Sequence, residues 1–267
     1  MIDGSWAAEA GGPRYGRLFG FIVAWWSSTA WTTFCASNSQ AAANYLLSEI
    51  TAFGLSYSTS VQDVNFRAVQ WIVAEAMLAM AVLVNFLPTR MYKHVFRAAV
   101  GVILLDFLLN VIWLPIGVAN TYGFQSADFV FKGTANLTGA SPVWNWYSPP
   151  PLFYSRGLII FRMLSYFVTA GILVGFDASG HVAEETKNAS LTAARGVFYS
   201  ALASGVIGFP IVILFLFCTP SLDTLFSFVS PQPFVNLYAL ALGQNAHVVM
   251  NVVAIVGLVL VCPYPPT

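Results

Sequence analysis

Charged side chains are scarce in this sequence, and their scarcity excludes a whole class of proteins. Asp, Glu, Lys and Arg make up only 8% of the 267 residues, whereas hydrophobic residues make up 58%. A soluble globular protein carries about 25% charged residues, so we predict an integral membrane protein that is surrounded by lipid. The formal net charge is zero, and no excess of basic residues indicates binding to nucleic acid.

Cysteine and nucleotide-binding glycine motifs are also lacking. The three cysteines, Cys35, Cys218 and Cys262, lie in or at the ends of separate apolar segments. Such an odd and scattered set predicts small packing residues, not a disulfide framework or a metal site. No Walker-type glycine loop is present, so we expect neither ATP drive from this chain nor a bound cofactor. Residues 1–17 lack a basic stretch followed by an apolar one, so we expect no cleavable signal peptide.

Long apolar segments are what the sequence has in abundance. A helix that crosses hydrocarbon needs about 20 mostly apolar residues. Six segments meet this length, which predicts an all-α integral membrane protein with six transmembrane helices. Between a lead-in of residues 1–17 and a tail of residues 263–267, the predicted spans cover residues 18–46, 70–87, 95–118, 157–176, 196–218 and 234–262. The small and polar second half of the first span suits packing against other helices or a wet cavity.

The distribution of basic residues predicts the orientation in the membrane. Cytoplasmic loops carry an excess of Lys and Arg. Seven basic residues fall on the side of the N-terminus and three on the other side, with Arg162 inside a span: Arg14, Arg17, Arg90, Lys93, Arg97, Lys187 and Arg195 against Arg67, Lys132 and Arg156. We therefore predict a cytoplasmic lead-in and an external loop at residues 119–156, which carries the glycosylation sequon Asn136-Leu137-Thr138.

Residues 175–190, GFDASGHVAEETKNAS, place polar groups directly after the fourth apolar segment. Unpaired backbone groups in hydrocarbon cost several kcal/mol each, so a helix is interrupted there only beside protein or a wet cavity. Two glycines allow the chain to leave helical geometry. Exposed amides of such a break bind a carboxylate, and its carbonyls bind an ammonium group or cation. The predicted substrate-binding residues are Gly175, Phe176, Asp177, Ala178, Ser179 and Gly180.

Each side chain in this stretch has a structural alternative. Asp177 could contact a substrate amine, take up a driving proton, or cap freed amides. Phe176 could cover a bound solute or only pack, and Ser179 could contact the solute or cap the next helix. His181 lies one turn beyond Asp177 and could relay a proton, although a structural histidine is favoured. Glu184 and Glu185 could close an inner gate, or form a solvated helix end.

An enzymatic reading of the same stretch is weak. Asp177, His181 and Glu184 could line one helix face, but the pattern lacks the second histidine of a zinc motif. The other histidines, His94 and His247, lie elsewhere in the sequence. We therefore predict that the chain is not an enzyme.

The stretch at 175–190, together with the following TAARGVFYSALASGVIGFP, resembles the amino acid–polyamine–organocation (APC) superfamily. It is most similar to the fungal permeases for amino acids, GABA and choline. GGPRYGRLFGFIVAWWSSTAW resembles the third helix of that family. The segment from Trp71 to Val118 resembles its fourth and fifth helices, and QPFVNLYALALGQNAHVVMNVVAIVGLV resembles its eighth.

The resemblance implies a LeuT-like transporter fold of two inverted five-helix repeats, of which this chain would be a fragment covering helices three to eight. It implies secondary active transport of amino acids or related amines such as GABA, polyamines or choline. The plasma membrane is favoured over the vacuolar membrane. The alternative is a truncated, non-transporting remnant or a structural membrane partner.

The resemblance also draws attention to Asp106 in the third apolar segment. In some relatives an ionisable group on the corresponding helix serves proton coupling, which makes Asp106 a candidate and a proton the candidate coupling ion. Asp106 and Asn110 lie four residues apart and therefore on one helix face. A carboxyl group facing the bundle would be uncharged unless partnered, and a hydrogen bond to a neighbouring helix is the structural alternative.

Overall fold

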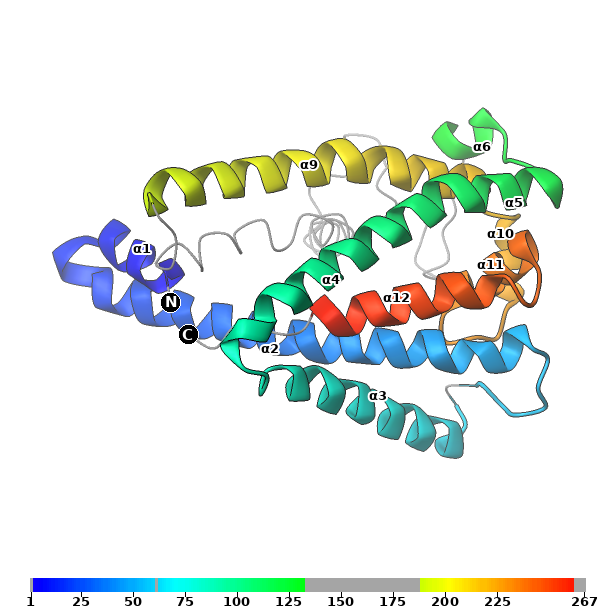
Figure 1. Cartoon of the computed structure of the whole chain (residues 1–267), viewed down its shortest axis with the longest axis horizontal. Coiled ribbons are helices and arrows are strands. Elements are labelled where there is room, and N and C mark those ends of the chain that lie inside the picture. Colours follow the sequence, from blue (N-terminus) through cyan, green and yellow to red (C-terminus); the bar gives the residue numbers. More distant parts are fainter. Residues whose placement is uncertain (1, 61, 133–187, 262–267) are drawn as a thin grey trace, which may run out of the picture. The chain divides into compact units, whose positions relative to one another are not determined.

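The computed structural model describes residues 2–60, 62–132 and 188–261, and every regular element within these ranges is a helix (Figure 1). This confirms the all-helical prediction for the described part of the chain. The chain divides into two compact units, which are Met1–Ser5 with Ser126–Leu216, and Trp6–Gln125 with Phe217–Thr267. The predicted span at 157–176 and the stretch at 175–187 lie outside the described residues.

The smaller unit contains α6 (Ala127–Lys132) and most of α9 (Ala189–Cys218). The exposed α6 carries an ion pair between Lys132 Nζ and Asp128 Oδ1 at 2.6 Å. In α9, residues Leu191–Cys218 are long enough to cross a membrane, and an 18-residue stretch within them has a mean hydropathy of 2.5. The predicted span at 196–218 is therefore a helix of the expected length and character.

The larger unit begins with α1 (Ile2–Ala10), most of which belongs to it, and the 41-residue α2 (Gly12–Ala52). Next comes α3 (Val64–Val84), which begins where the Asp63 side chain accepts a hydrogen bond from the Asn65 amide at 2.9 Å. Such a cap satisfies an amide that has no partner within the helix. The mean hydropathy of α3 is 1.6, and its length suffices to cross a membrane.

The third predicted span is a long continuous helix whose hydrogen-bond pattern changes from α to π and back to α. Helix α4 (Thr89–Leu108) continues through the π-helical segment η1 (Leu109–Trp113) into α5 (Leu114–Asn120). Pro115 lies two residues beyond the end of η1, and its nitrogen cannot donate a helical hydrogen bond, which favours a local register change. An 18-residue stretch within Arg90–Asn120 has a mean hydropathy of 2.2.

The sequence predicts one span over residues 234–262, whereas the structure divides this stretch into two helices. After the short α10 (Leu222–Ser227), α11 (Pro233–Leu242) ends at Gly243 and α12 begins at His247 and runs to Val261. Gly243 has φ 87° and ψ 162°, a left-handed backbone that glycine adopts at little cost. The four residues of the break, Gly243 to Ala246, include two polar side chains.

Three helices within the described ranges are long and apolar enough to cross a membrane, namely Val64–Val84, Arg90–Asn120 and Leu191–Cys218. They coincide with the predicted spans at 70–87, 95–118 and 196–218. The count of six spans and the LeuT-like repeat remain predictions.

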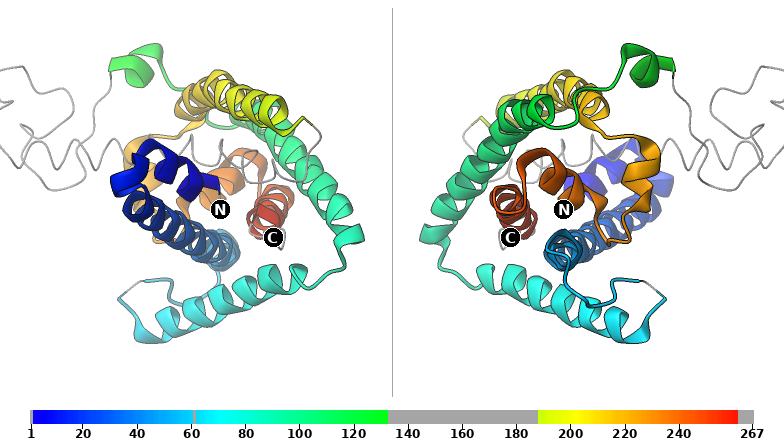
Figure 2. Two further views of the ribbon diagram at one scale, coloured as in Figure 1. Left: turned by 90° about the vertical axis from the view of Figure 1, so that its left-hand side faces the viewer. Right: turned by 90° about the vertical axis from the view of Figure 1, so that its right-hand side faces the viewer.

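Helix α2 is the centre of the larger unit. Helices α3 and α12 both pack along α2, while α12 also packs on α4 (Figures 1 and 2). Small residues face these neighbours: Ser39, Ala42, Ala43 and Ser48 of α2 are all buried. Ser39, Ala42 and Ala43 are spaced to share one helix face, whereas Ser48 lies on another side of α2. The prediction that the second half of the first span packs against other helices is confirmed.

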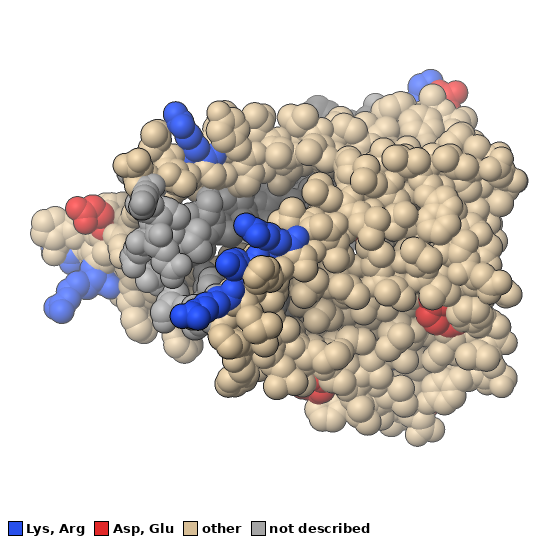
Figure 3. Space-filling model, viewed as in Figure 1, with Lys and Arg blue, Asp and Glu red and all other residues tan. Residues whose placement is uncertain are grey.

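The surface of the larger unit suits lipid contact. Large apolar side chains on α2, α3 and α4 are exposed, including Trp26 at 70% and Leu83 at 64%. Figure 3 shows one face of the molecule, on which charged side chains are sparse and basic side chains gather over the start of α4. Membrane helices carry such basic residues at their ends and apolar residues along their length.

Candidate functional site

A cavity of about 340 Å³ lies between α2, α4 and α12. Its volume is within the range of sites that hold small organic molecules. Its wall is mostly apolar and is formed by Phe34, Asn38, Tyr45, Val102, Ile103, Asp106, Val253, Ala254, Gly257, Leu258 and Val261. All of these residues belong to the larger unit.

Polar groups from two helices enter this apolar wall. Asp106 from α4 is partly buried and contributes a carboxyl group. Asn38 from α2 contributes an amide whose buried Nδ2 atom has no hydrogen-bond partner among the described residues. A carboxyl group that ionises beside a cation, together with an unused donor, can bind a molecule that carries both an amine and an acceptor group.

Asn110 connects the helix that carries Asp106 to helix α11. Asn110 Nδ2 donates to the backbone oxygen of Asp106 at 2.9 Å, and Asn110 Oδ1 accepts from the Tyr238 hydroxyl at 2.9 Å. The hydrogen bond between helices α11 and η1 is thus made by Asn110, and it leaves the Asp106 side chain at the cavity.

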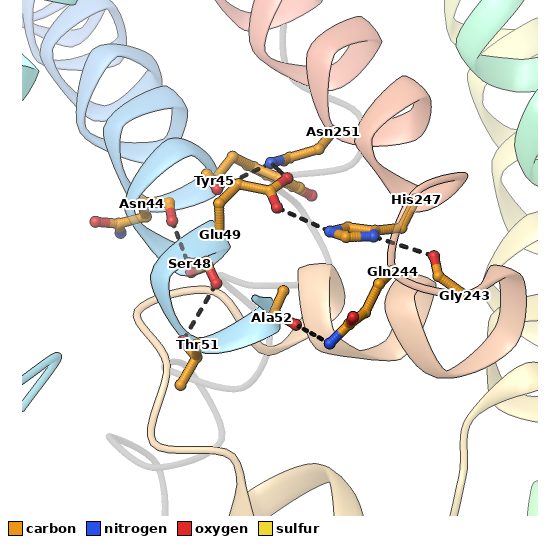
Figure 4. A network of polar contacts seen from close by, with 10 residues as sticks. All are labelled: Asn44, Tyr45, Ser48, Glu49, Thr51, Ala52, Gly243, Gln244, His247 and Asn251. Atoms are coloured by element: carbon orange, nitrogen blue, oxygen red, sulfur yellow. Dashed lines mark hydrogen bonds and ion pairs between the residues drawn. The ribbon is translucent and has the colours of Figure 1, made fainter. Parts of the chain in front are cut away.

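A second polar cluster joins the end of α2 to the start of α12 (Figure 4). Glu49 Oε2 lies 2.8 Å from His247 Nε2, and the other Glu49 oxygen accepts from Asn251 Nδ2. Asn251 Nδ2 also donates to the Tyr45 backbone oxygen at 3.1 Å. The His247 side chain is fully buried and its ring lies beside Phe53, with centroids 5.5 Å apart.

The break between α11 and α12 is tied to the same end of α2. His247 Nδ1 lies 3.2 Å from the Gly243 carbonyl oxygen, and Gln244 Nε2 donates to the Ala52 oxygen at 3.4 Å. On the other side of α11, Ser48 Oγ accepts from the Gln232 amide at 2.8 Å. Side-chain contacts with α2 therefore hold both ends of α11 and the start of α12.

Of the predicted substrate-binding, proton-coupling and gating residues, only Asp106 lies within the residues that the structure describes. The predicted binding residues Gly175, Phe176, Asp177, Ala178, Ser179 and Gly180 lie outside the described residues, as do His181, Glu184 and Glu185. Within the described ranges, no group of three His, Cys, Asp or Glu residues could hold a metal ion.

Sequence reasoning missed the Glu49 cluster. One signal was available, because His247 and Asn251 are spaced to share a helix face. Glu49, however, is separated from His247 by 198 residues, and no local pattern links the two.

Comparison with known proteins supports the resemblance. The family model "Amino acid permease" matches residues 5–263 of the chain. The thiamine transporter thi9 of Schizosaccharomyces pombe is 45% identical over 280 residues, which cover 96% of this chain and 45% of that protein. The chain thus spans about half the length of this relative. No solved structure gives a significant match. The predicted resemblance is confirmed, and the chain belongs to the amino acid permease family of the APC superfamily, whose members are membrane transporters and not enzymes.

Proposed function

We propose that this chain belongs to a secondary active transporter of small organic amines. The observation that carries the proposal is the cavity between α2, α4 and α12, which places the Asp106 carboxyl group in an apolar wall within a chain of the permease family. Amino acids, GABA, polyamines and choline all carry a cationic nitrogen. Thiamine, which the name of the yeast relative specifies, is also an organic cation.

The chemistry of the cavity favours this substrate class. A cation loses its water on entering apolar surroundings, and an anionic partner offsets that cost. Asp106 supplies the negative charge, and the unused Asn38 amide can donate to a carboxylate or hydroxyl of the same solute. The apolar remainder of the wall can pack against the carbon skeleton.

On sequence grounds, we also propose that Gly175–Gly180 bind substrate. Free amides and carbonyls of an interrupted helix would bind the charged ends of a zwitterion there. In this proposal Asp177 contacts the amine or a proton, while His181, Glu184 and Glu185 contribute to proton transfer or to an inner gate. Rocking of helix bundles about the site, driven by a proton gradient across the plasma membrane, would move the solute.

Uptake by intact cells tests the proposal. The full-length gene product that contains this chain is expressed in cells without their own amine permeases, and radiolabelled amino acids, GABA, choline and thiamine are offered in turn. We expect uptake of at least one of them above background, with a higher rate at acidic external pH. No uptake of any compound by a correctly inserted protein would overturn the proposal and favour a structural membrane partner. Expression of the 267-residue chain by itself shows whether this portion transports without the rest.

A further inference from the structure

The pair Glu49–His247 is buried and lies outside the wall of the substrate cavity. The His247 side chain has no exposed surface and that of Glu49 is 17% exposed. His247 uses both ring nitrogens, because Nδ1 lies 3.2 Å from the Gly243 carbonyl oxygen and Nε2 lies 2.8 Å from Glu49 Oε2. One imidazole thus links the break between α11 and α12 to α2 (Figure 4).

The two contacts of the His247 ring determine how many hydrogens the Glu49–His247 pair must carry. The Gly243 carbonyl can only accept, so Nδ1 must carry a hydrogen. An ionised carboxylate can also only accept, so the contact with Glu49 needs a second hydrogen, either on Nε2 or on the carboxyl group. In both cases the pair holds one proton more than a neutral imidazole beside an ionised carboxylate. Its net charge is then zero, which suits a buried position.

Loss of that proton breaks one of the two links. A neutral imidazole has one N–H group and can donate to Gly243 or to Glu49, but not to both. The other contact would set two lone pairs against each other at 3.2 Å or 2.8 Å. The His247 ring must then lose its hydrogen bond either to Gly243 in the break or to Glu49 on α2.

Few other ionisable groups face the pair. No Lys or Arg forms an ion pair with Glu49 in the described part of the chain. The helices that pack against α12 also carry the titratable side chains Tyr45 on α2, Tyr238 on α11 and Asp106 on α4. The charged residues of α3, Arg67 and Glu75, are exposed.

We propose that Glu49 and His247 form a single proton-binding site that fastens the α11–α12 break to α2 only when the proton is bound. The site deepens the transport function proposed above, and its use in coupling rests on that function, because a proton-driven carrier needs packing contacts that change on protonation. Proton binding itself does not depend on transport.

Two substitutions separate this site from a merely structural pair. In Glu49→Gln, the amide nitrogen can donate to an unprotonated Nε2, while the amide oxygen still accepts from Asn251. Both links then form without the extra proton. His94→Gln is the matched control, because it removes an exposed histidine on α4.

Hydrogen exchange of the purified full-length protein is measured from about pH 5 to about pH 8, the range in which histidine titrates, and is corrected for the intrinsic rate. In the wild type we expect exchange in peptides covering the break, which include the His247 amide bonded to Gly243, to become about tenfold faster as the proton leaves. Glu49→Gln should remain protected throughout, and His94→Gln should follow the wild type. Exchange of α3 peptides reports whether each variant is folded.

Protection at the break that does not change with pH in the folded wild type would overturn the proposal, as would a pH dependence retained in folded Glu49→Gln. If Glu49→Gln does not fold, the wild-type profile alone decides. Uptake is scored separately: a protein that shows the exchange pattern but moves no solute leaves the proton site standing and refutes transport. A protein that takes up solute but lacks the exchange pattern supports transport and refutes the proton site.

Discussion

At the scale of single residues, Asp106 is the side chain on which the substrate class depends. We expect Asp106→Asn to reduce uptake of a cationic amine at least about tenfold, because a charge-assisted hydrogen bond is replaced by a neutral one of the same shape. Initial uptake rates at equal surface expression measure the effect. Glu75→Gln is the control, since it neutralises an exposed carboxylate on α3. Wild-type uptake by Asp106→Asn would return this residue to a structural role.

Asp177 carries the corresponding prediction for the interrupted helix. We expect Asp177→Asn to lose most or all uptake while the protein still inserts normally, because the amide can neither attract the amine electrostatically nor take up a proton. The measurement compares initial uptake rates with surface biotinylation of the same cells. Unchanged uptake would favour the alternative in which Asp177 only caps freed amides.

Tyr238 is important for stability, not for substrate binding. Its hydroxyl donates to Asn110 Oδ1 inside the helix packing, so Tyr238→Phe leaves a buried acceptor without this partner. We expect the stability to fall by about 1 kcal/mol, seen as a lower thermal midpoint of the detergent-solubilised protein. Tyr57→Phe, at an exposed position, should leave the midpoint unchanged. Equal midpoints for the two variants would contradict this account.

At the scale of helices, the close approach of α5 to α11 depends on Gly117. A Cβ atom added at this residue would lie 2.6 Å from the Ala241 carbonyl oxygen. Gly117→Ala must therefore push the two helices apart, and we expect a loss of about 1–3 kcal/mol. Gly101→Ala on α4 is the matched control, since no atom lies within 4 Å of its added Cβ.

The control should be neutral or slightly stabilising, because alanine favours a helix by about 1 kcal/mol over glycine. Thermal midpoints of both variants give the comparison. If Gly117→Ala is as stable as Gly101→Ala, the close approach of α5 and α11 is not important for stability.

The sequence predicted helices well where apolar length alone decides. The rod of residues Arg90–Asn120 was expected, from a predicted span at 95–118, because about 20 mostly apolar residues in a row favour a helix that crosses the membrane. The break at Gly243 was not expected. Its polar residues lie between two apolar runs, so they do not interrupt the average hydropathy. The contacts that tie it down come from Glu49 and Ala52, almost two hundred residues away.

The candidate site was likewise predictable in part, because the sequence indicated some of its residues and not others. Asp106 stood out because a carboxylate in an apolar run is costly and hence informative. Glu49 lies at the end of its apolar segment, where a carboxylate normally faces water, whereas its contacts with His247 and Asn251 of α12 leave it only 17% exposed. Asn38 was covered only by the general expectation that this half of the segment faces other helices or a cavity.

At the scale of the whole molecule, the orientation in the membrane can be read from glycosylation. The excess of basic residues on one side predicts that Asn136 is external and Asn188 cytoplasmic. We expect Asn136→Gln to abolish the mobility shift that glycosidase treatment produces in the wild type, whereas Asn188→Gln should leave it unchanged. A shift that depends on Asn188 would invert the predicted topology.

The length of α2 has a consequence for how the protein meets the bilayer surface. At 1.5 Å per residue, its 41 residues extend about 60 Å, roughly twice the hydrocarbon thickness. Even at a tilt of about 40°, its projection on the bilayer normal is about 47 Å. A span at α2, which the sequence predicts, must therefore leave one end or both among headgroups or in water, where a water-soluble reagent can modify a cysteine introduced there.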